Sequence, residues 1–176
     1  MIPLNVTHTA IVTKQLHSKL LGSDGSTTLA DGTLPKPTSS LRHTLSTVIS
    51  FFADSYKSTF GFLEGPPLHD ALTIGYVSHP ELFKCRRYRV DIELNGAFTS
   101  GETVVDIWQY RSCDDSWGWK GKNCLVAETV DVIIFESSYS NSPCSLAISY
   151  LQVGGFFDLF LECVSQCDKV SPLNKS

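Results

Sequence analysis

The sequence predicts a single α/β domain, and three observations support this class. A short apolar segment, Met1 to Val6, precedes a helical pattern, which is the strand-then-helix order of α/β folds. Apolar residues recur at intervals of three and four from Leu41 to Tyr56, which indicates a helix with one buried face. The stretch RYRVDIELNG alternates apolar and polar residues, which indicates a strand with one wet face. With 176 residues, 42% of them hydrophobic, the chain is long enough to form its own core.

The first part of the chain predicts one strand and three helices. Met1 to Val6 is expected to form a short buried strand, and Thr7 to cap a helix that runs to about Leu21. Residues 22–40 are rich in Gly, Ser, Thr and Pro, which predicts a flexible loop. Ser40 is expected to cap the second helix, and the third begins near the pair His69-Asp70.

The second part predicts three strands and a last helix. The turn at Asn95-Gly96 joins RYRVDIEL to a partner strand in ETVVDIW. A further strand is expected from Cys124 to Val132, after a loop that contains CDDSWGWKGKN. The apolar face of the last helix is formed by Phe156, Phe157, Leu159, Phe160, Cys163, Val164 and Cys167.

Composition argues against several classes of partner. The net charge is −4, and Lys84-Cys85-Arg86-Arg87 is the one basic cluster that stands out, so no nucleic-acid partner is expected. No apolar window reaches the roughly 18 residues of a membrane span, and no membrane partner is expected. The start of the sequence does not match a secretory signal. We therefore predict a cytoplasmic protein, with a nuclear location also compatible, and expect the six cysteines to be reduced thiols.

The stretch EGPPLHDAL contains the residues with the clearest chemical potential. Proline fixes φ and Gly65 permits a sharp bend, so GPP can hold the following residues rigidly at a helix entrance. His69 suits proton transfer, since its ordinary pKa lies near neutrality. Asp70 is a hard oxygen ligand that suits Ca²⁺ or Mg²⁺. In the alternative interpretation, Asp70 caps a helix and His69 is a surface or core histidine.

Three aromatic residues precede this pair. Tyr56, Phe60 and Phe62 are candidates for lining a pocket that binds an aromatic base, and core packing is the alternative. His8 is expected to be structural.

The sequence resembles a known family at several places. GPPLHDALTIGYV, PELF and RRYRVDIELNGAFTSGETVVD are similar to the C-terminal portion of the inosine-uridine preferring nucleoside hydrolases, with the fungal uridine nucleosidases as the nearest pattern. PLNVTH and GFFDLFLECV also fit. The resemblance implies that residues 1–176 form part of a nucleoside hydrolase domain. Its fold would be the incomplete C-terminal part of an open, mostly parallel, Rossmann-like sheet with flanking helices.

The resemblance also implies an activity. These enzymes hydrolyse the N-glycosidic bond of ribonucleosides to ribose and a free base, and the pattern here favours pyrimidine nucleosides, with uridine first. Their calcium ion lowers the pKa of the attacking water. By this resemblance Asp70 is a calcium ligand, His69 is the catalytic histidine beside the leaving base, and the family's usual homodimer or homotetramer is expected.

Two departures qualify these expectations. The family's opening aspartate cluster, DxDxxxDD, is absent, and one carboxylate holds Ca²⁺ poorly because the ion takes about six to eight oxygens. We therefore expect the chain alone to show weak or no activity. The alternatives are a degenerate, non-catalytic fragment or interaction module, and a metal-independent small-molecule binder. The second departure is IIFESSYSNSPCSLAISYLQV, residues 133–153, which is either an insertion or an unspliced segment.

Overall fold

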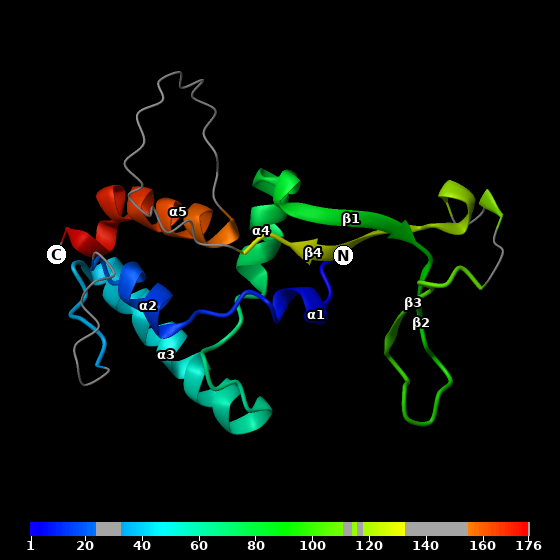
Figure 1. The fold of residues 1–176 in the computed structure, drawn as a ribbon, viewed down its shortest axis with the longest axis horizontal. Helices are drawn as coiled ribbons and strands as arrows, with labels where there is room; N and C mark the ends of the chain where they lie inside the picture. Colours follow the sequence, from blue (N-terminus) through cyan, green and yellow to red (C-terminus); the bar gives the residue numbers. More distant parts are fainter. Residues whose placement is uncertain (24–32, 111–113, 116–117, 133–154, 176) are drawn as a thin grey trace, which may run out of the picture.

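The computed structural model describes residues 1–23, 33–110, 114–115, 118–132 and 155–175 (Figure 1). Its α-helices are α1 (Leu4–Thr7), α2 (Lys14–Leu20), α3 (Ser40–Phe60), α4 (Asp70–Ser78) and α5 (Phe156–Val170). Its strands are β1 (Phe83–Tyr88), β2 (Val90–Ile92), β3 (Thr103–Val105) and β4 (Cys124–Val130). Short 3₁₀ turns are η1 (Pro80–Leu82), η3 (Trp119–Gly121) and η4 (Pro172–Asn174). Within the described residues no helix is long and apolar enough to cross a membrane.

The described strands pair in two antiparallel sheets. β1 pairs with β4 from Phe83 opposite Val130 to Tyr88 opposite Cys124, and β2 pairs with β3. The mixed helix and strand content fits the predicted α/β class, but the parallel pairing expected for the sheet is not formed between these strands. The physical reason is the short connection between β2 and β3. The chain turns back there and β4 then returns beside β1, whereas parallel neighbours need a long crossover.

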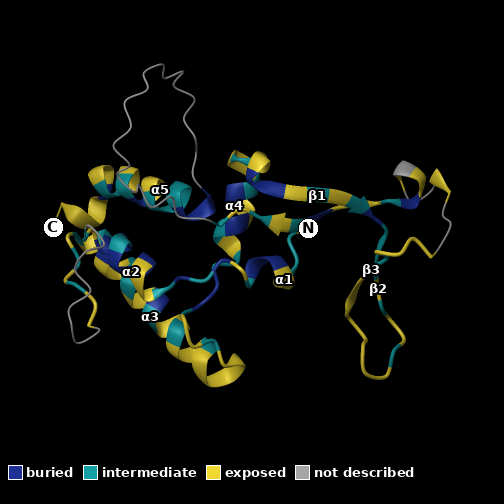
Figure 2. Cartoon of the chain, in the orientation of Figure 1, coloured by how far each residue is buried: buried dark blue, intermediate teal, exposed yellow. Residues whose placement is uncertain are grey.

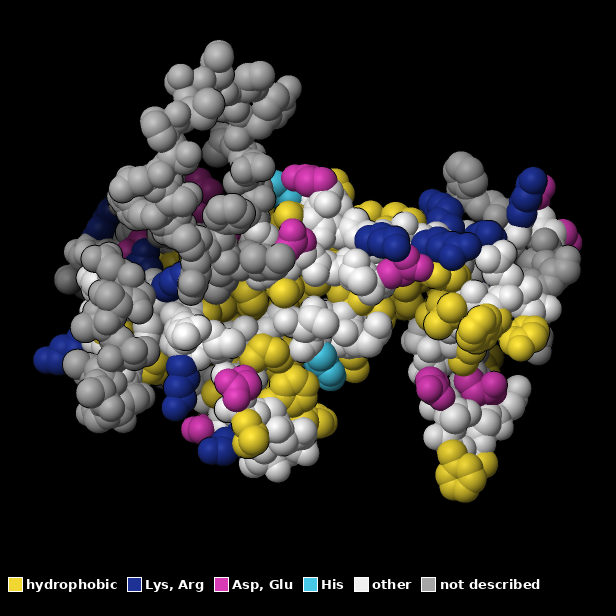
Figure 3. Space-filling view, viewed as in Figure 1, with side chains coloured by type: hydrophobic (Ala, Val, Ile, Leu, Met, Phe, Trp, Pro, Cys, Tyr) yellow, Lys and Arg dark blue, Asp and Glu magenta, His cyan; other side chains and the backbone are white. Residues whose placement is uncertain are grey.

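The β2–β3 hairpin projects away from the helices (Figure 1). Its apolar side chains lie on the molecular surface (Figure 3). The large exposed ones on and beside it are Ile92, Leu94, Phe98, Val104, Ile107, Trp108 and Tyr110. Two-stranded ribbons are marginally stable by themselves, so this hairpin contributes little core of its own.

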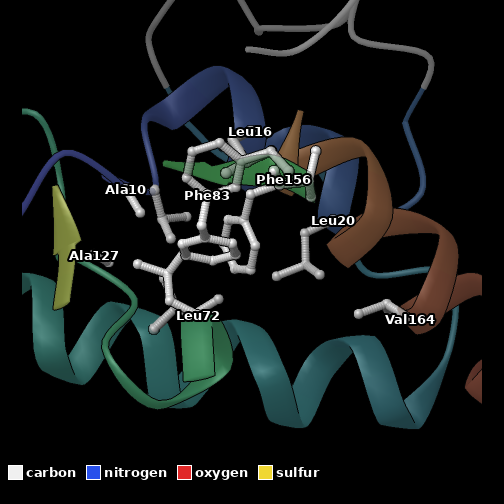
Figure 4. Close-up of a cluster of buried hydrophobic side chains, with 12 residues drawn as sticks. Ala10, Leu16, Leu20, Leu72, Phe83, Ala127, Phe156 and Val164 are labelled. Carbon is white, nitrogen blue, oxygen red and sulfur yellow. The ribbon is translucent and has the colours of Figure 1, made fainter. Parts of the chain in front are cut away.

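The core lies where α2, α4, β1 and α5 meet (Figures 2 and 4). Leu16, Leu20, Leu72 and Phe156 are almost completely buried there. Phe156 begins α5 and its ring lies against Gly75 of α4, where an added Cβ would approach the ring to 3.1 Å. Burying each of these side chains contributes about 1.5–3 kcal/mol, so the last helix is an integral part of the core.

The prediction for the first residues is wrong. Leu4–Thr7 is a short helix rather than a strand, and the predicted helix from Thr7 to Leu21 is interrupted before α2. The interruption pairs with the GPP segment instead: Val12 N–H donates to Pro66 O at 2.9 Å, and Leu68 N–H donates to Ala10 O at 2.9 Å. These tertiary hydrogen bonds outweigh the local helical pattern.

The other helices agree with the prediction to within a residue or two, and α5 extends beyond its predicted face. The α3 cap is Ser39 rather than Ser40, since its hydroxyl accepts the Arg42 N–H at 3.2 Å. The helix ends at Gly61, whose φ of 74° is left-handed and favours glycine. The predicted strand RYRVDIEL is divided into the end of β1 and β2, while β4 and the partner strand β3 are confirmed.

Helix α5 is tied to the body by a buried arginine. Arg42 donates through Nε to Asp168 Oδ2 at 2.8 Å, and through Nη2 to Ser165 Oγ at 3.1 Å. Its Nη1 donates to Leu20 O. Hydrogen bonds from Ser39 and Arg42 hold the pKa of Asp168 down to about 2. One arginine therefore joins α2, α3 and α5.

The residue that follows the end of β4 is hydrogen-bonded to the first residue of α5. Asp131 O accepts the Phe156 N–H at 2.7 Å. The segment 133–153 lies outside the described residues, and so do residues 24–32 of the predicted loop 22–40, so the insertion and the flexibility of the loop stay predictions.

Candidate functional site

The GPP segment fixes the entrance of α4. Pro66 and Pro67 are buried, and the main chain there pairs with the stretch before α2. Gly65 has a φ of 144°, and a Cβ at this position would lie 2.0 Å from Val12 O. Only glycine fits this approach, so Gly65 sets the path that leads the chain to His69.

His69 lies directly before α4, with both ring nitrogens engaged. Its Nδ1 is 2.8 Å from Thr7 Oγ1 and its Nε2 is 2.6 Å from the Tyr56 hydroxyl. Thr7 donates its own hydroxyl proton to Leu4 O at 3.2 Å, so its oxygen accepts from His69 Nδ1–H. The neutral imidazole therefore carries its proton on Nδ1, and Nε2 accepts the Tyr56 O–H.

The surroundings favour this neutral form. Burial lowers the pKa of His69, and the nearby His8 lowers it further, whereas Asp70 acts in the opposite direction. The His8 and His69 rings lie edge to face with centroids 5.5 Å apart. At neutral pH His69 is consequently a hydrogen-bond acceptor at Nε2 and not a proton donor there.

The three predicted aromatic residues gather around this histidine. The Tyr56 ring lies 5.7 Å from His69, 5.2 Å from Phe60 and 5.7 Å from Phe62, centroid to centroid. Phe62 also contacts His8 at 5.1 Å. Phe60 is 64% exposed, so core packing does not explain its position. The cluster reaches the surface at Phe60, while Tyr56 and Phe62 are half-buried.

Asp70 is the first residue of α4 and is exposed. No side-chain hydrogen bond caps this helix, so the structure does not support the interpretation of Asp70 as its cap. His69 is more enclosed, and the two side chains have different surroundings. Within the described residues no three His, Cys, Asp or Glu side chains group as metal ligands. Asp70 alone does not fit the oxygen-rich shell of a calcium ion.

Two clefts lie elsewhere on the described surface. One of about 480 Å³ is lined by the β2–β3 hairpin, and one of about 290 Å³ lies between α2, α3 and Gly65–Pro66. Neither is lined by His69 or Asp70, but Phe62 borders the smaller one. The hydrogen bonds and aromatic contacts at His69 are more specific than either hollow, and we take them as the candidate site.

Sequence reasoning missed two residues of this site. Thr7 was expected to cap a helix, and His8 was expected to be structural. Both come from a segment about 60 residues before His69, so spacing gives no sign of the contact. The one available signal was PLNVTH, which contains both residues and fits the resemblance.

Comparison with known proteins shows the family of the chain. The family model of the inosine-uridine preferring nucleoside hydrolases matches residues 1–137. A probable ribonucleoside hydrolase of Dictyostelium discoideum is 41% identical over 108 residues, which cover 61% of this chain and 29% of the relative. The pyrimidine-specific ribonucleoside hydrolase RihA of Salmonella paratyphi A is 32% identical over 115 residues, 61% of this chain and 30% of that one.

A solved structure supports the fold. The purine-preferring ribonucleoside hydrolase of Gardnerella vaginalis superposes with a TM-score of 0.51 at 23% identity, over 75% of this chain and 35% of that one. The chain thus spans about a third of the length of these proteins. Because the family model covers most of the sequence, the chain belongs to the inosine-uridine preferring nucleoside hydrolase family.

Proposed function

We propose that this chain supplies the leaving-base side of a ribonucleoside hydrolase site. The reaction is hydrolysis of the N-glycosidic bond to ribose and a free base, with pyrimidine nucleosides, uridine first, as substrates. The observation that carries the proposal is the hydrogen-bonded row Thr7–His69–Tyr56 beside an aromatic cluster that reaches the surface at Phe60. The Dictyostelium relative, a probable ribonucleoside hydrolase, supports the reaction, and the Salmonella relative, which is pyrimidine-specific, supports pyrimidine substrates.

The aromatic cluster suits a nucleobase. Tyr56, Phe60 and Phe62 offer apolar ring faces, and stacking a base on an aromatic ring contributes about 1–3 kcal/mol. The Tyr56 oxygen keeps lone pairs after donating to His69, so it can also accept a hydrogen bond from the base.

His69 has two distinct roles at different pH. In its neutral form it holds the Tyr56 hydroxyl in place and so orients the base. In its protonated form it passes the Nε2 proton to the Tyr56 oxygen while the Tyr56 hydroxyl proton moves to the leaving base, and the imidazole ends neutral. Since its pKa is lowered, the protonated fraction is small at neutral pH and falls further as pH rises.

The family is metal-dependent. We assign Asp70 as one ligand of a calcium ion whose other ligands come from outside the described residues, since these lack a metal-ligand cluster. The chain alone is then expected to bind calcium weakly and to hydrolyse nucleosides slowly or not at all. The cytoplasmic location and the homodimer or homotetramer are parts of the same proposal.

The experiment compares this chain with a fusion. Ribose release from uridine is measured for the 176-residue chain, and for the chain joined to the part of the Dictyostelium relative that precedes its match. Activity is expected in the fusion alone. His69→Gln and Tyr56→Phe should lower kcat in the fusion, while Asp54→Asn on the exposed side of α3 should leave it unchanged.

Ordinary family rates from the unfused chain would contradict the expected weakness. Equal rates in the His69→Gln fusion and its parent would remove the role assigned to His69.

A non-catalytic interaction module is the second candidate. The exposed apolar side chains of the β2–β3 hairpin favour it, because such patches mark interaction surfaces. Calorimetry with ribose and Ca²⁺ on the fusion separates the two functions. Binding of ribose that depends on calcium supports the hydrolase, and its absence supports the module or a metal-independent binder.

A further inference from the structure

Two asparagine side chains of the described residues are held firmly by main-chain contacts. Asn123 accepts the Val90 N–H at 2.8 Å and donates to Val90 O at 2.9 Å. Asn174 accepts the Leu41 N–H at 3.0 Å and donates to Asp168 O at 2.7 Å. Both the oxygen and the nitrogen of each side-chain amide are therefore engaged, and neither amide can turn without losing hydrogen bonds.

Asn95, at the turn between β2 and β3, is exposed and differs from both. Its main-chain N–H donates to Glu93 Oε1 at 2.7 Å, while its side-chain amide makes no hydrogen bond to any described residue. The next residue is Gly96, where an added Cβ would lie 2.1 Å from Thr99 Oγ1. The turn therefore favours glycine after Asn95, and no side chain shields the Gly96 nitrogen from the Asn95 amide.

The Glu93 carboxylate restrains the Gly96 nitrogen. Its Oε1 also accepts the Gly96 N–H at 3.1 Å. The N–H groups of Asn95 and Gly96 lower the pKa of Glu93, so the carboxylate is ionised at neutral pH. A negative acceptor stabilises an amide that keeps its proton and disfavours one that has lost it. The structure thus combines a free asparagine side chain with a restrained nitrogen beside it.

We propose that Asn95 is a site of spontaneous deamidation and that the Glu93 carboxylate slows the reaction by retaining the Gly96 amide proton. A solvent base removes this proton, and the Gly96 nitrogen forms a bond to Asn95 Cγ. The bond from Cγ to the side-chain nitrogen breaks, and that nitrogen takes a proton from water and leaves as ammonia. Water then opens the cyclic imide at either carbonyl carbon, which leaves aspartate or isoaspartate at position 95.

The product would weaken the hairpin. Glu93 N–H donates to Glu102 O at 2.9 Å, and Glu93 O accepts the Gly101 N–H at 2.7 Å. A new carboxylate next to Glu93 repels it, and isoaspartate adds a methylene to the main chain of the turn. Glu93 also lines the cleft of about 480 Å³ at this hairpin, so the modification changes the charge of that surface. This inference does not depend on the chain being a hydrolase.

The test incubates the full chain at neutral pH and follows each asparagine by peptide mass spectrometry, with isoaspartyl methyltransferase as a second probe. Deamidation at Asn95 should be about tenfold faster or more than at Asn123 or Asn174, whose side chains must first break two hydrogen bonds. The rate at Asn95 should rise with pH, because a base removes the Gly96 proton. In urea the rates at Asn123 and Asn174 should rise as their hydrogen bonds are lost.

Glu93→Gln is the variant that tests the restraint, and Glu102→Gln on the same hairpin is its matched control. Glutamine leaves a neutral, weaker acceptor for the Gly96 N–H, so the rate at Asn95 should rise about fivefold or more. Glu102 is exposed and the Gly96 N–H is held by Glu93, so the control should keep the parent rate. In urea the Glu93→Gln chain and its parent should deamidate equally at Asn95.

Three results would overturn the proposal. They are equal rates at Asn95 in the folded Glu93→Gln chain and its parent, an equal rise in the Glu102→Gln chain, and deamidation of Asn123 or Asn174 as fast as that of Asn95.

Discussion

His69 owes its protonation state to residues that surround it from two sides. Thr7 accepts from Nδ1 and Tyr56 donates to Nε2, so both hydrogen bonds fit the neutral ring. His8 and Asp70 act on its pKa in opposite directions. The pKa of His69 therefore responds to both neighbours, and the direction of each effect is known.

We predict opposite shifts from two substitutions at this site. His8→Gln removes a group that lowers the pKa of His69, so that pKa should rise toward 6.5. Asp70→Asn removes the carboxylate that raises it, so it should fall. An NMR titration of the His69 ring measures both, with the exposed His43 as an internal control. Shifts of the same sign in both variants would contradict the geometry.

The candidate residues proposed from the sequence are close together along the chain, whereas the residues that support them are not. His69, Asp70 and three aromatic residues lie within 15 positions of each other, and a local motif points to them. Thr7 and His8 reach the site through folding of a distant segment, which no local pattern encodes. The hydrogen bond from His69 Nδ1 to Thr7, which fixes the tautomer of the imidazole, was therefore not predictable from the sequence.

At the scale of elements, two glycines with positive φ behave differently. Gly61 ends α3 with no heavy atom within 4 Å of an added Cβ, whereas the same atom on Gly65 would meet Val12 O at 2.0 Å. We predict that Gly61→Ala costs about 1 kcal/mol of unfolding free energy, from backbone strain alone. Gly65→Ala should cost about 3 kcal/mol or more, because it also breaks the pairing with the stretch before α2.

Urea unfolding measures both costs. The Gly65 change should in addition disturb the His69 ring signals, while the Gly61 change should not. Equal costs in the two variants would show that the close approach to Val12 is unimportant.

The α5 anchor gives a prediction with a pH window. The folded pKa of Asp168 is about 2, below the ordinary 3.8, so its stabilisation is complete above about pH 4 and is lost as pH falls toward 2. Asp168→Asn should cost about 2 kcal/mol at neutral pH, since Arg42 is buried and loses its charged acceptor. The difference between variant and parent should shrink at low pH. Glu162→Gln, on the exposed side of the same helix, is the control and should change neither quantity.

Elements with strong periodicity followed their patterns. The 21-residue α3 and the 15-residue α5 have long apolar stripes and were placed within two residues of their starts. The segment before α2 has a helical pattern of the same type, but it pairs with Pro66 and Leu68 instead. Long-range hydrogen bonds determine the conformation of that segment, and they cannot be read from a single sequence.

At the scale of the whole molecule, the described chain leaves many large apolar side chains exposed. The exposed groups include Phe51 and Phe52 on α3. They also include the apolar side chains of the β2–β3 hairpin (Figure 3). The sequence predicted an incomplete fold from the absent aspartate cluster, and the exposed apolar groups agree with it. The antiparallel pairing of β2 with β3 follows from the turn predicted at Asn95-Gly96. The return of β4 beside β1 was not predictable, since no local pattern encodes it.

The hydrogen bond between Asp131 and Phe156 has a consequence for the residues between them. If residues 133–154 were deleted and Val132 were joined to Gly155, Asp131 and Phe156 would become the first and fourth residues of a β-turn already closed by its own hydrogen bond. Glycine at the third position suits several such turns. We predict that this shortened chain unfolds cooperatively with a Tm within about 4 °C of the parent. Calorimetry would show it, and a loss of the cooperative transition would mean that the deleted stretch is needed by the core.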